Sequence, residues 1–139
     1  ERLRREEEER VRREEEERVA AEVAAVERMA KAMEDAVRKG DIPTLVKMLR
    51  VSPDGGDASD EQKEKAAIAL RNLASMAARN HAYNWVAIRE EGGIELLVEM
   101  AKGGAPRGKE WATRALRNLA GNEQNKKLIA QAGFYLGGF

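Results

Sequence analysis

The chain has 139 residues, with 25 Lys and Arg balanced by 25 Asp and Glu, so its formal net charge is zero. It has no Cys, three Pro and only 4% aromatic residues. The composition favours a single all-helical domain and lacks the basic excess of nucleic-acid-binding domains. It also excludes disulfides, thiolate metal sites and Cys nucleophiles. No apolar stretch approaches the roughly 18 residues that span a bilayer, so we expect no membrane insertion.

The chain begins at Glu1 rather than Met. We therefore expect a processed form or a fragment of a longer protein, from which targeting signals are missing. The charged N-terminus shows neither a signal peptide nor an anchor, and the expected location is intracellular, in the cytoplasm.

The first 18 residues are almost entirely Glu and Arg and contain a perfect octad repeat. RREEEERV occurs at Arg4–Val11 and again at Arg12–Val19. On a helix this spacing sets opposite charges four residues apart, as in Glu6 and Arg10, and each such pair contributes about 0.2–0.5 kcal/mol. We predict a solvated helical rod over residues 1–18, either a plain helix extension or a spacer or docking arm.

Residues 19–40 predict an amphipathic helix that leads into the rest of the chain. Its apolar residues alternate in spacings of four and three, which is a heptad seam. The seam consists of Val19, Val23, Val26, Ala30, Met33 and Val37. We expect this face to pack on the following helices, with burial on another chain as the alternative. Gly40, after two basic residues, predicts the end of the helix.

The remaining sequence repeats itself with a unit of about 41–52 residues. ALRNLA occurs at Ala69–Ala74 and at Ala115–Ala120, and Asn84–Gly92 matches Asn125–Gly133. A looser match joins residues 40–49 to residues 92–101. Each unit predicts a short helix, a Gly turn, a second helix, a loop and a longer third helix.

One face of each predicted third helix is apolar and rich in Ala, which lets neighbouring helices approach closely. The two faces are Ala66, Ala69, Leu70, Leu73 and Ala74, and Ala112, Ala115, Leu116, Leu119 and Ala120. Ser59 or Asp60 can cap the first of these helices.

GGIELLVEMAKGG followed by KEWATRALRNLAGNEQNKKLIAQAG resembles an armadillo repeat, with Leu-Arg-Asn-Leu-Ala in its third helix. The resemblance covers roughly residues 33–133. It implies an all-α fold: a short armadillo-like right-handed helical solenoid over residues 41–133, preceded by a long charged N-terminal helix. Two units would be followed by the first helix of a third. The apolar tail, residues 134–139, reads as a truncated repeat or a partner contact, or alternatively as a cap that folds back.

The resemblance also implies a concave groove lined by the third helices, in which an Asn pairs with the backbone of an extended peptide. Asn72 and Asn118 hold the matching positions. Proteins of the importin-alpha type carry a Trp four residues earlier, where this chain has Ile68 and Arg114, and an Arg would repel a basic peptide. Trp111 lies on the same face as Asn118. The candidate partner-binding residues are Lys65, Ile68, Asn72, Trp111, Arg114 and Asn118.

Each of these residues also has a purely structural interpretation. The two Asn side chains can bridge neighbouring repeats, and Trp111 and Trp85 can serve packing alone. His81 is the only His in a chain without Cys, which argues against a metal site. The carboxylates follow salt-bridge patterns, and GGAPRGK lacks the final Ser or Thr of a phosphate loop. We therefore expect no catalytic residue, cofactor or metal, and no enzyme.

The sequence thus predicts a non-catalytic protein-interaction module or scaffold that binds a protein or an extended peptide in the groove, and no nucleic acid. The alternative is a structural or linker subunit of a multi-subunit assembly, anchored by the N-terminal helix and the apolar tail. An engineered or fused scaffold is a third interpretation, suggested by the octad repeat, although the irregular loops have a natural character.

Overall fold

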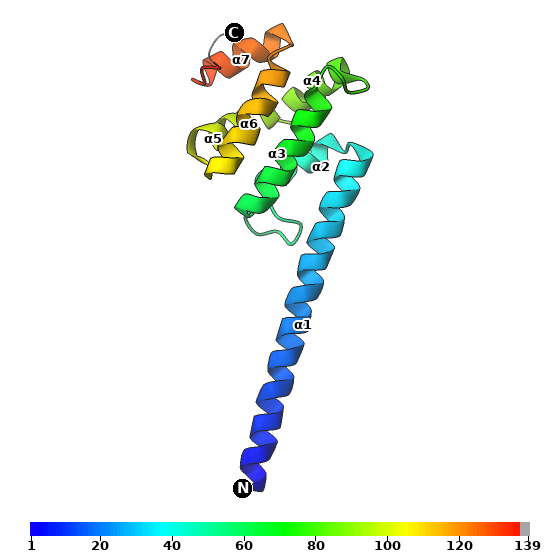
Figure 1. Cartoon of the computed structure of the whole chain (residues 1–139), viewed down its shortest axis with the longest axis vertical. Coiled ribbons are helices and arrows are strands. Elements are labelled where there is room, and N and C mark those ends of the chain that lie inside the picture. Colours follow the sequence, from blue (N-terminus) through cyan, green and yellow to red (C-terminus); the bar gives the residue numbers. More distant parts are fainter. Residues whose placement is uncertain (137–139) are drawn as a thin grey trace.

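The computed structural model describes residues 1–136, and over this range the chain folds into seven helices without a β-sheet. The helices are α1 (Arg2–Lys39), α2 (Ile42–Lys47), α3 (Asp60–Ala74), α4 (His81–Glu90), α5 (Gly93–Gly103), α6 (Pro106–Leu119) and α7 (Glu123–Gln131). The all-α prediction is confirmed. In Figure 1 the first half of α1 projects away from a body formed by the other helices. None of the described helices has the length and apolar character needed to cross a membrane.

Helix α1 is continuous over 38 residues, and it ends where the sequence predicts. Gly40 adopts a left-handed conformation with φ of 62°, which a residue without a Cβ adopts at little cost. The backbone N–H of Asp41 donates to the carbonyl oxygen of Ala36 at 2.9 Å. The chain therefore turns sharply at Gly40 and enters α2.

The rod carries ion pairs, but they differ from the predicted ones. Arg10 pairs with Glu7 at 3.4 Å and with Glu14 at 3.9 Å, rather than with Glu6. Arg18 likewise pairs with Glu15 and Glu22. Because Glu is so frequent in the octad, each Arg has acidic neighbours on both adjacent turns. The rod is therefore supported by redundant pairs along its own surface.

The face of α1 that packs on the body shares only Met33 with the predicted heptad seam. Met33 and Ala36 are buried, and Ala32 packs beside them on the core. Val19, Val23 and Val26 stay 46%, 50% and 65% exposed. Ala32 and Ala36 lie more than a quarter turn around the helix from the valines, and their small side chains allow a close approach. The prediction that the seam packs within this chain is therefore wrong for its valines but holds for Met33, while burial of the valines on another chain stays a prediction.

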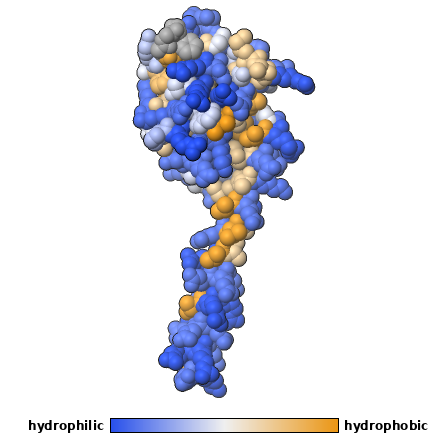
Figure 2. Space-filling model, viewed as in Figure 1, coloured by the Kyte–Doolittle hydropathy of each residue, from blue (hydrophilic) through white to orange (hydrophobic). Residues whose placement is uncertain are grey.

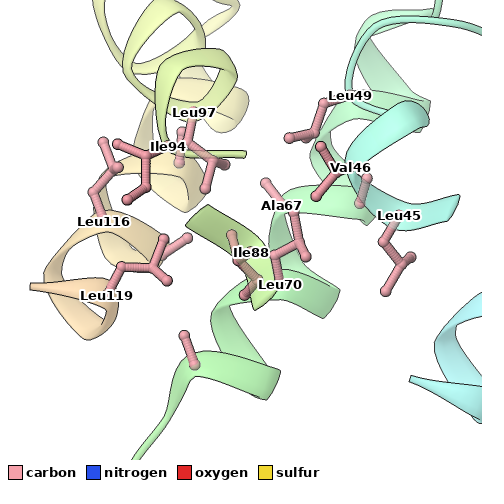
Figure 3. Close-up of a cluster of buried hydrophobic side chains, with 14 of the residues drawn as sticks. Leu45, Val46, Leu49, Ala67, Leu70, Ile88, Ile94, Leu97, Leu116 and Leu119 are labelled. Carbon is pink, nitrogen blue, oxygen red and sulfur yellow. The ribbon is translucent and has the colours of Figure 1, made fainter. Parts of the chain in front are cut away.

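The body has one hydrophobic core, to which α2 to α6 all contribute (Figure 3). Helices α3 and α6 lie side by side (Figure 1). Leu70 of α3 and Leu116 of α6 are completely buried in this core. The Ala residues of the predicted apolar faces, among them Ala66 and Ala112, are also buried. The local periodicity therefore identified the packed face of both helices.

The loop before α3 is held by polar contacts of its own. Ser59 Oγ accepts a hydrogen bond from the N–H of Gln62 at 3.1 Å and caps the helix, as one of the two predicted caps. The buried Gln62 side chain donates to the carbonyl oxygens of Met48 and Val51 at 2.8 and 2.9 Å. Within the loop, hydrogen bonds from Ser52 and then from Gly56 hold the pKa of Asp54 below its usual value.

The described part of the C-terminal tail folds back onto the body. Leu136 is buried and Phe134 packs against the core, whereas Tyr135 is 85% exposed. This arrangement agrees with the alternative of a cap for residues 134–136. The last three residues, 137–139, which include Phe139, lie outside the described range.

Candidate functional site

The outer faces of α3 and α6 form one surface, which we call the α3–α6 surface. The two helices run in the same direction (Figure 1), and their equivalent residues differ by 46 in number, so that each predicted residue of α3 has a counterpart on α6. Lys65 is exposed and pairs with Glu61 at 3.2 Å. Ile68 is half-buried, and Asn72 is exposed. The tertiary structure therefore brings the six predicted residues to two adjacent helices.

Asn118 connects the two helices. Its Nδ2 donates to the carbonyl oxygen of Arg71 on α3 at 2.9 Å. This is the bridging role that the sequence offered as the structural alternative. A primary amide has a second N–H and an oxygen with two lone pairs, so one bridge does not use all of its bonding capacity.

Asn72 differs from Asn118 in its exposure and in its hydrogen-bond partner. Its side chain is exposed, and its Oδ1 accepts a hydrogen bond from Arg71 Nη1 at 2.9 Å. Both hydrogens of a primary amide are on its nitrogen, so this contact leaves the Nδ2 donors of Asn72 unused. The two Asn residues are equivalent in sequence, but Asn72 is the more accessible to a partner.

Two guanidinium groups lie close to the ring of Trp111. Its ring is half-buried against the core, with the guanidinium carbon of Arg114 at 4.8 Å and that of Arg71 at 5.8 Å from the ring centroid. Arg114 also pairs with Glu110 at 2.6 Å. Two cations from different helices therefore meet at one aromatic ring, in the geometry of cation–π contacts.

Arg71 was not among the predicted site residues. It belongs to the repeated ALRNLA segment and directly precedes Asn72, so its position in the repeat was visible. Its proximity to Trp111 depends on how α3 packs against α6, which the periodicity of a single helix does not specify. Its charge extends the argument made for Arg114, because both side chains would repel a basic ligand.

The second repeated motif, at the start of α4 and α7, has a structural role. Trp85 Nε1 donates to the carbonyl oxygen of Ala74 at 2.7 Å, and Asn84 Nδ2 donates to that of Leu73 at 2.9 Å. Asn125 is completely buried and donates to the carbonyl oxygen of Trp85 at 3.1 Å. The first two contacts tie α4 to the end of α3, and the third ties α7 to α4. Both agree with the packing interpretation of Trp85.

Two further polar features of the described residues lie outside the α3–α6 surface. His81 stacks edge-on against Trp85, with ring centroids 4.9 Å apart. Between residues 1 and 136, no group of His, Asp and Glu converges as a metal site. An open cleft of about 460 Å³ separates the loop before α3 from α5, and side chains of both signs line it, including Arg50, Asp57 and Glu99.

Comparison with known proteins gives one partial similarity. A segment of 56 residues is 48% identical to U-box domain-containing protein 2 of Arabidopsis thaliana. It covers 40% of this chain and 7% of that protein. No family model and no solved structure matches the chain. The similar segment is close in length to one repeat unit.

Proposed function

We propose that this chain is a non-catalytic protein-interaction module that binds an extended peptide along the α3–α6 surface, in the manner of an armadillo-like right-handed solenoid. The observation that carries the proposal is the alignment of equivalent side chains on two adjacent parallel helices, where Arg71 contacts both an accessible amide, Asn72, and the ring of Trp111.

The order of the helices supports the solenoid. The first unit consists of three helices: the end of α1, then α2, then α3. Its third helix, α3, packs against the next unit. Helices α4, α5 and α6 repeat this order, and α7 begins it a third time. A repeat protein buries its core by stacking such units on their neighbours, and α3 against α6 is the main contact between the units here.

The spacing of the helices suits an extended ligand. Packed helices are about 8–10 Å apart, and an extended chain rises about 3.3 Å per residue. Side chains on α3 and α6 would thus meet peptide groups two or three residues apart. An Asn amide offers both a donor and an acceptor and can pair with a backbone whatever its sequence.

The charges at Trp111 bear on the kind of ligand. Arg71 and Arg114 offer guanidinium donors to carboxylate or carbonyl oxygens. A peptide rich in Lys and Arg would meet repulsion at this position. The expected ligand is therefore neutral or acidic beside Trp111.

The test is a selection of displayed peptides on the whole chain, followed by affinity measurements on variants. Asn72→Ala and Arg114→Glu change exposed side chains, and each is expected to weaken a selected peptide by at least about tenfold. Lys127→Ala, exposed on α7, is the matched control. Asn118→Ala is less suitable, because it also breaks the bridge to Arg71. If both variants bind the selected peptide with unchanged affinity, the proposal that peptides bind along the α3–α6 surface is wrong.

A second candidate function is that of a linker subunit in a larger assembly, and the exposed apolar side chains of the rod, Leu3 and Val11, favour it. The discriminating experiment compares the Asn72→Ala, Arg114→Glu double variant with a chain lacking residues 1–18. If a protein partner still binds the double variant but no longer binds the shortened chain, the linker function is correct and the groove is incidental.

A further inference from the structure

The apolar seam of α1 forms an exposed stripe beside the body. We define the valine stripe as Val19, Val23, Val26 and Ala30, which are all exposed. Figure 2 shows hydrophobic side chains gathered on the projecting helix where it meets the body. Three neighbouring valines on one helix face, each about half exposed, are more than the scattered single apolar residues that are normal for a protein surface.

The valine stripe runs into a hollow between α1 and the start of α3. This hollow has a volume of about 130 Å³. Val26, Met29 and Met33 line its α1 side, and Ser59, Gln62 and Lys65 belong to its other wall. A helix that lay along the stripe would therefore find space for an apolar side chain at the junction with the body.

Acidic residues flank the valine stripe on both sides. With the seam residues at heptad positions a and d, Glu22 occupies position g, and Glu27 and Glu34 occupy position e. Glu22 pairs with Arg18 of its own helix at 3.7 Å, whereas Glu27 and Glu34 face solvent without an ion pair in the described structure. The flanking charge is therefore negative on both edges.

This charge pattern argues against a second copy of the chain as the occupant. In a parallel pair, Glu22 of one copy would face Glu27 of the other, because positions g and e meet across the interface. An antiparallel pair would bring like positions together, again with Glu against Glu. A partner helix with Lys or Arg beside its apolar face would instead form ion pairs with these Glu residues.

We propose that the valine stripe is a docking site for an amphipathic helix of another protein, whose apolar face is bordered by Lys or Arg. Its apolar residues cover Val19, Val23 and Val26, its basic residues pair with the flanking Glu residues, and one apolar side chain enters the hollow beside Met33. This contact meets the α3–α6 surface only at Lys65, which lines the hollow, and it does not depend on peptide binding at that surface.

The test uses the whole chain and two labelled synthetic helices of about three heptads, both with Leu at a and d. One has Lys at e and g, and the other has Glu. In fluorescence anisotropy the Lys-flanked helix is expected to bind at least about tenfold more tightly than the Glu-flanked one. Equal binding of the two helices, or none of either, would overturn the proposal.

Two variants locate the contact. Val23→Glu with Val26→Glu is expected to weaken the binding of the Lys-flanked helix by at least about tenfold. Ala21→Glu with Arg28→Gln lowers the net charge by the same amount at exposed positions away from the stripe and serves as the control. Circular dichroism should show that both variants keep their helix, because Glu is a good helix former. Unchanged affinity of the Val variant would place the binding elsewhere.

Reversing the charge of the Glu residues beside the valine stripe then tests whether they select the partner helix. Glu22→Lys with Glu27→Lys is expected to reverse the preference, so that the Glu-flanked helix binds more tightly. Sedimentation of the unliganded chain decides between occupants. A monomer supports the proposal, whereas a dimer that is lost in Val23→Glu with Val26→Glu would show that a second copy covers the stripe and would overturn the proposal.

Discussion

The projecting part of α1 and the helical body are both α-helical, but for different reasons. In the rod, Val11 is 50% exposed. The helix there is stabilised by ion pairs between residues on neighbouring turns, such as Arg10 with Glu14, and not by burial of apolar side chains. In the body, Leu70 and Leu116 are completely buried between helices. The same secondary structure therefore depends on local pairing in one region and on tertiary burial in the other.

The largest expected effect comes from a cavity in the body. Leu116→Ala removes a completely buried side chain and should lower the free energy of unfolding by about 2–5 kcal/mol. Urea denaturation followed by circular dichroism measures this loss. Val11→Ala in the rod is the control and should leave the unfolding midpoint unchanged. Similar losses from both changes would contradict the contrast between rod and body.

A smaller effect is expected from the buried amide of Asn125. Its Oδ1 accepts from Arg89 Nη1 at 3.0 Å, and its Nδ2 donates to the carbonyl oxygen of Trp85 at 3.1 Å. Asn125→Ala leaves both partners without this amide and should cost about 1–3 kcal/mol in unfolding free energy. Asn72→Ala changes an exposed amide and should cost far less. If the two variants unfold alike, the amide of Asn125 adds no stability to the body.

The smallest effect is the salt dependence of the rod, which we expect to differ from that of the body. Raising NaCl from about 0.1 M to about 1 M shortens the screening length from about 10 Å to about 3 Å. The helical signal should fall slightly, while the unfolding midpoint of the body stays nearly constant. Glu7→Gln with Glu14→Gln removes both acidic partners of Arg10 and should make the signal less sensitive to salt. A rod signal independent of salt would show that propensity alone maintains the helix.

Much of the fold was predictable because it depends on neighbours in the sequence. The cap at Ser59, the helix end at Gly40 and the buried faces around Leu70 and Leu116 all follow from contacts or spacings within a few residues. The candidate site was predictable in part. Asn72 and Asn118 were found from their repeated positions, but Arg71, which approaches Trp111 from the other helix, was not.

The sequence by itself determined that the chain is helical, where its units repeat and which face of each body helix is apolar, because 3.6-residue periodicity and capping are local properties. Only the tertiary structure decided which side of α1 meets the body. Ala32 and Ala36 pack on the body beside Met33, where small side chains allow a close approach, while the valines of the seam stay exposed. It also decided that Asn118 bridges α6 to α3 while Asn72 faces solvent, since that difference arises only when two distant helices pack together.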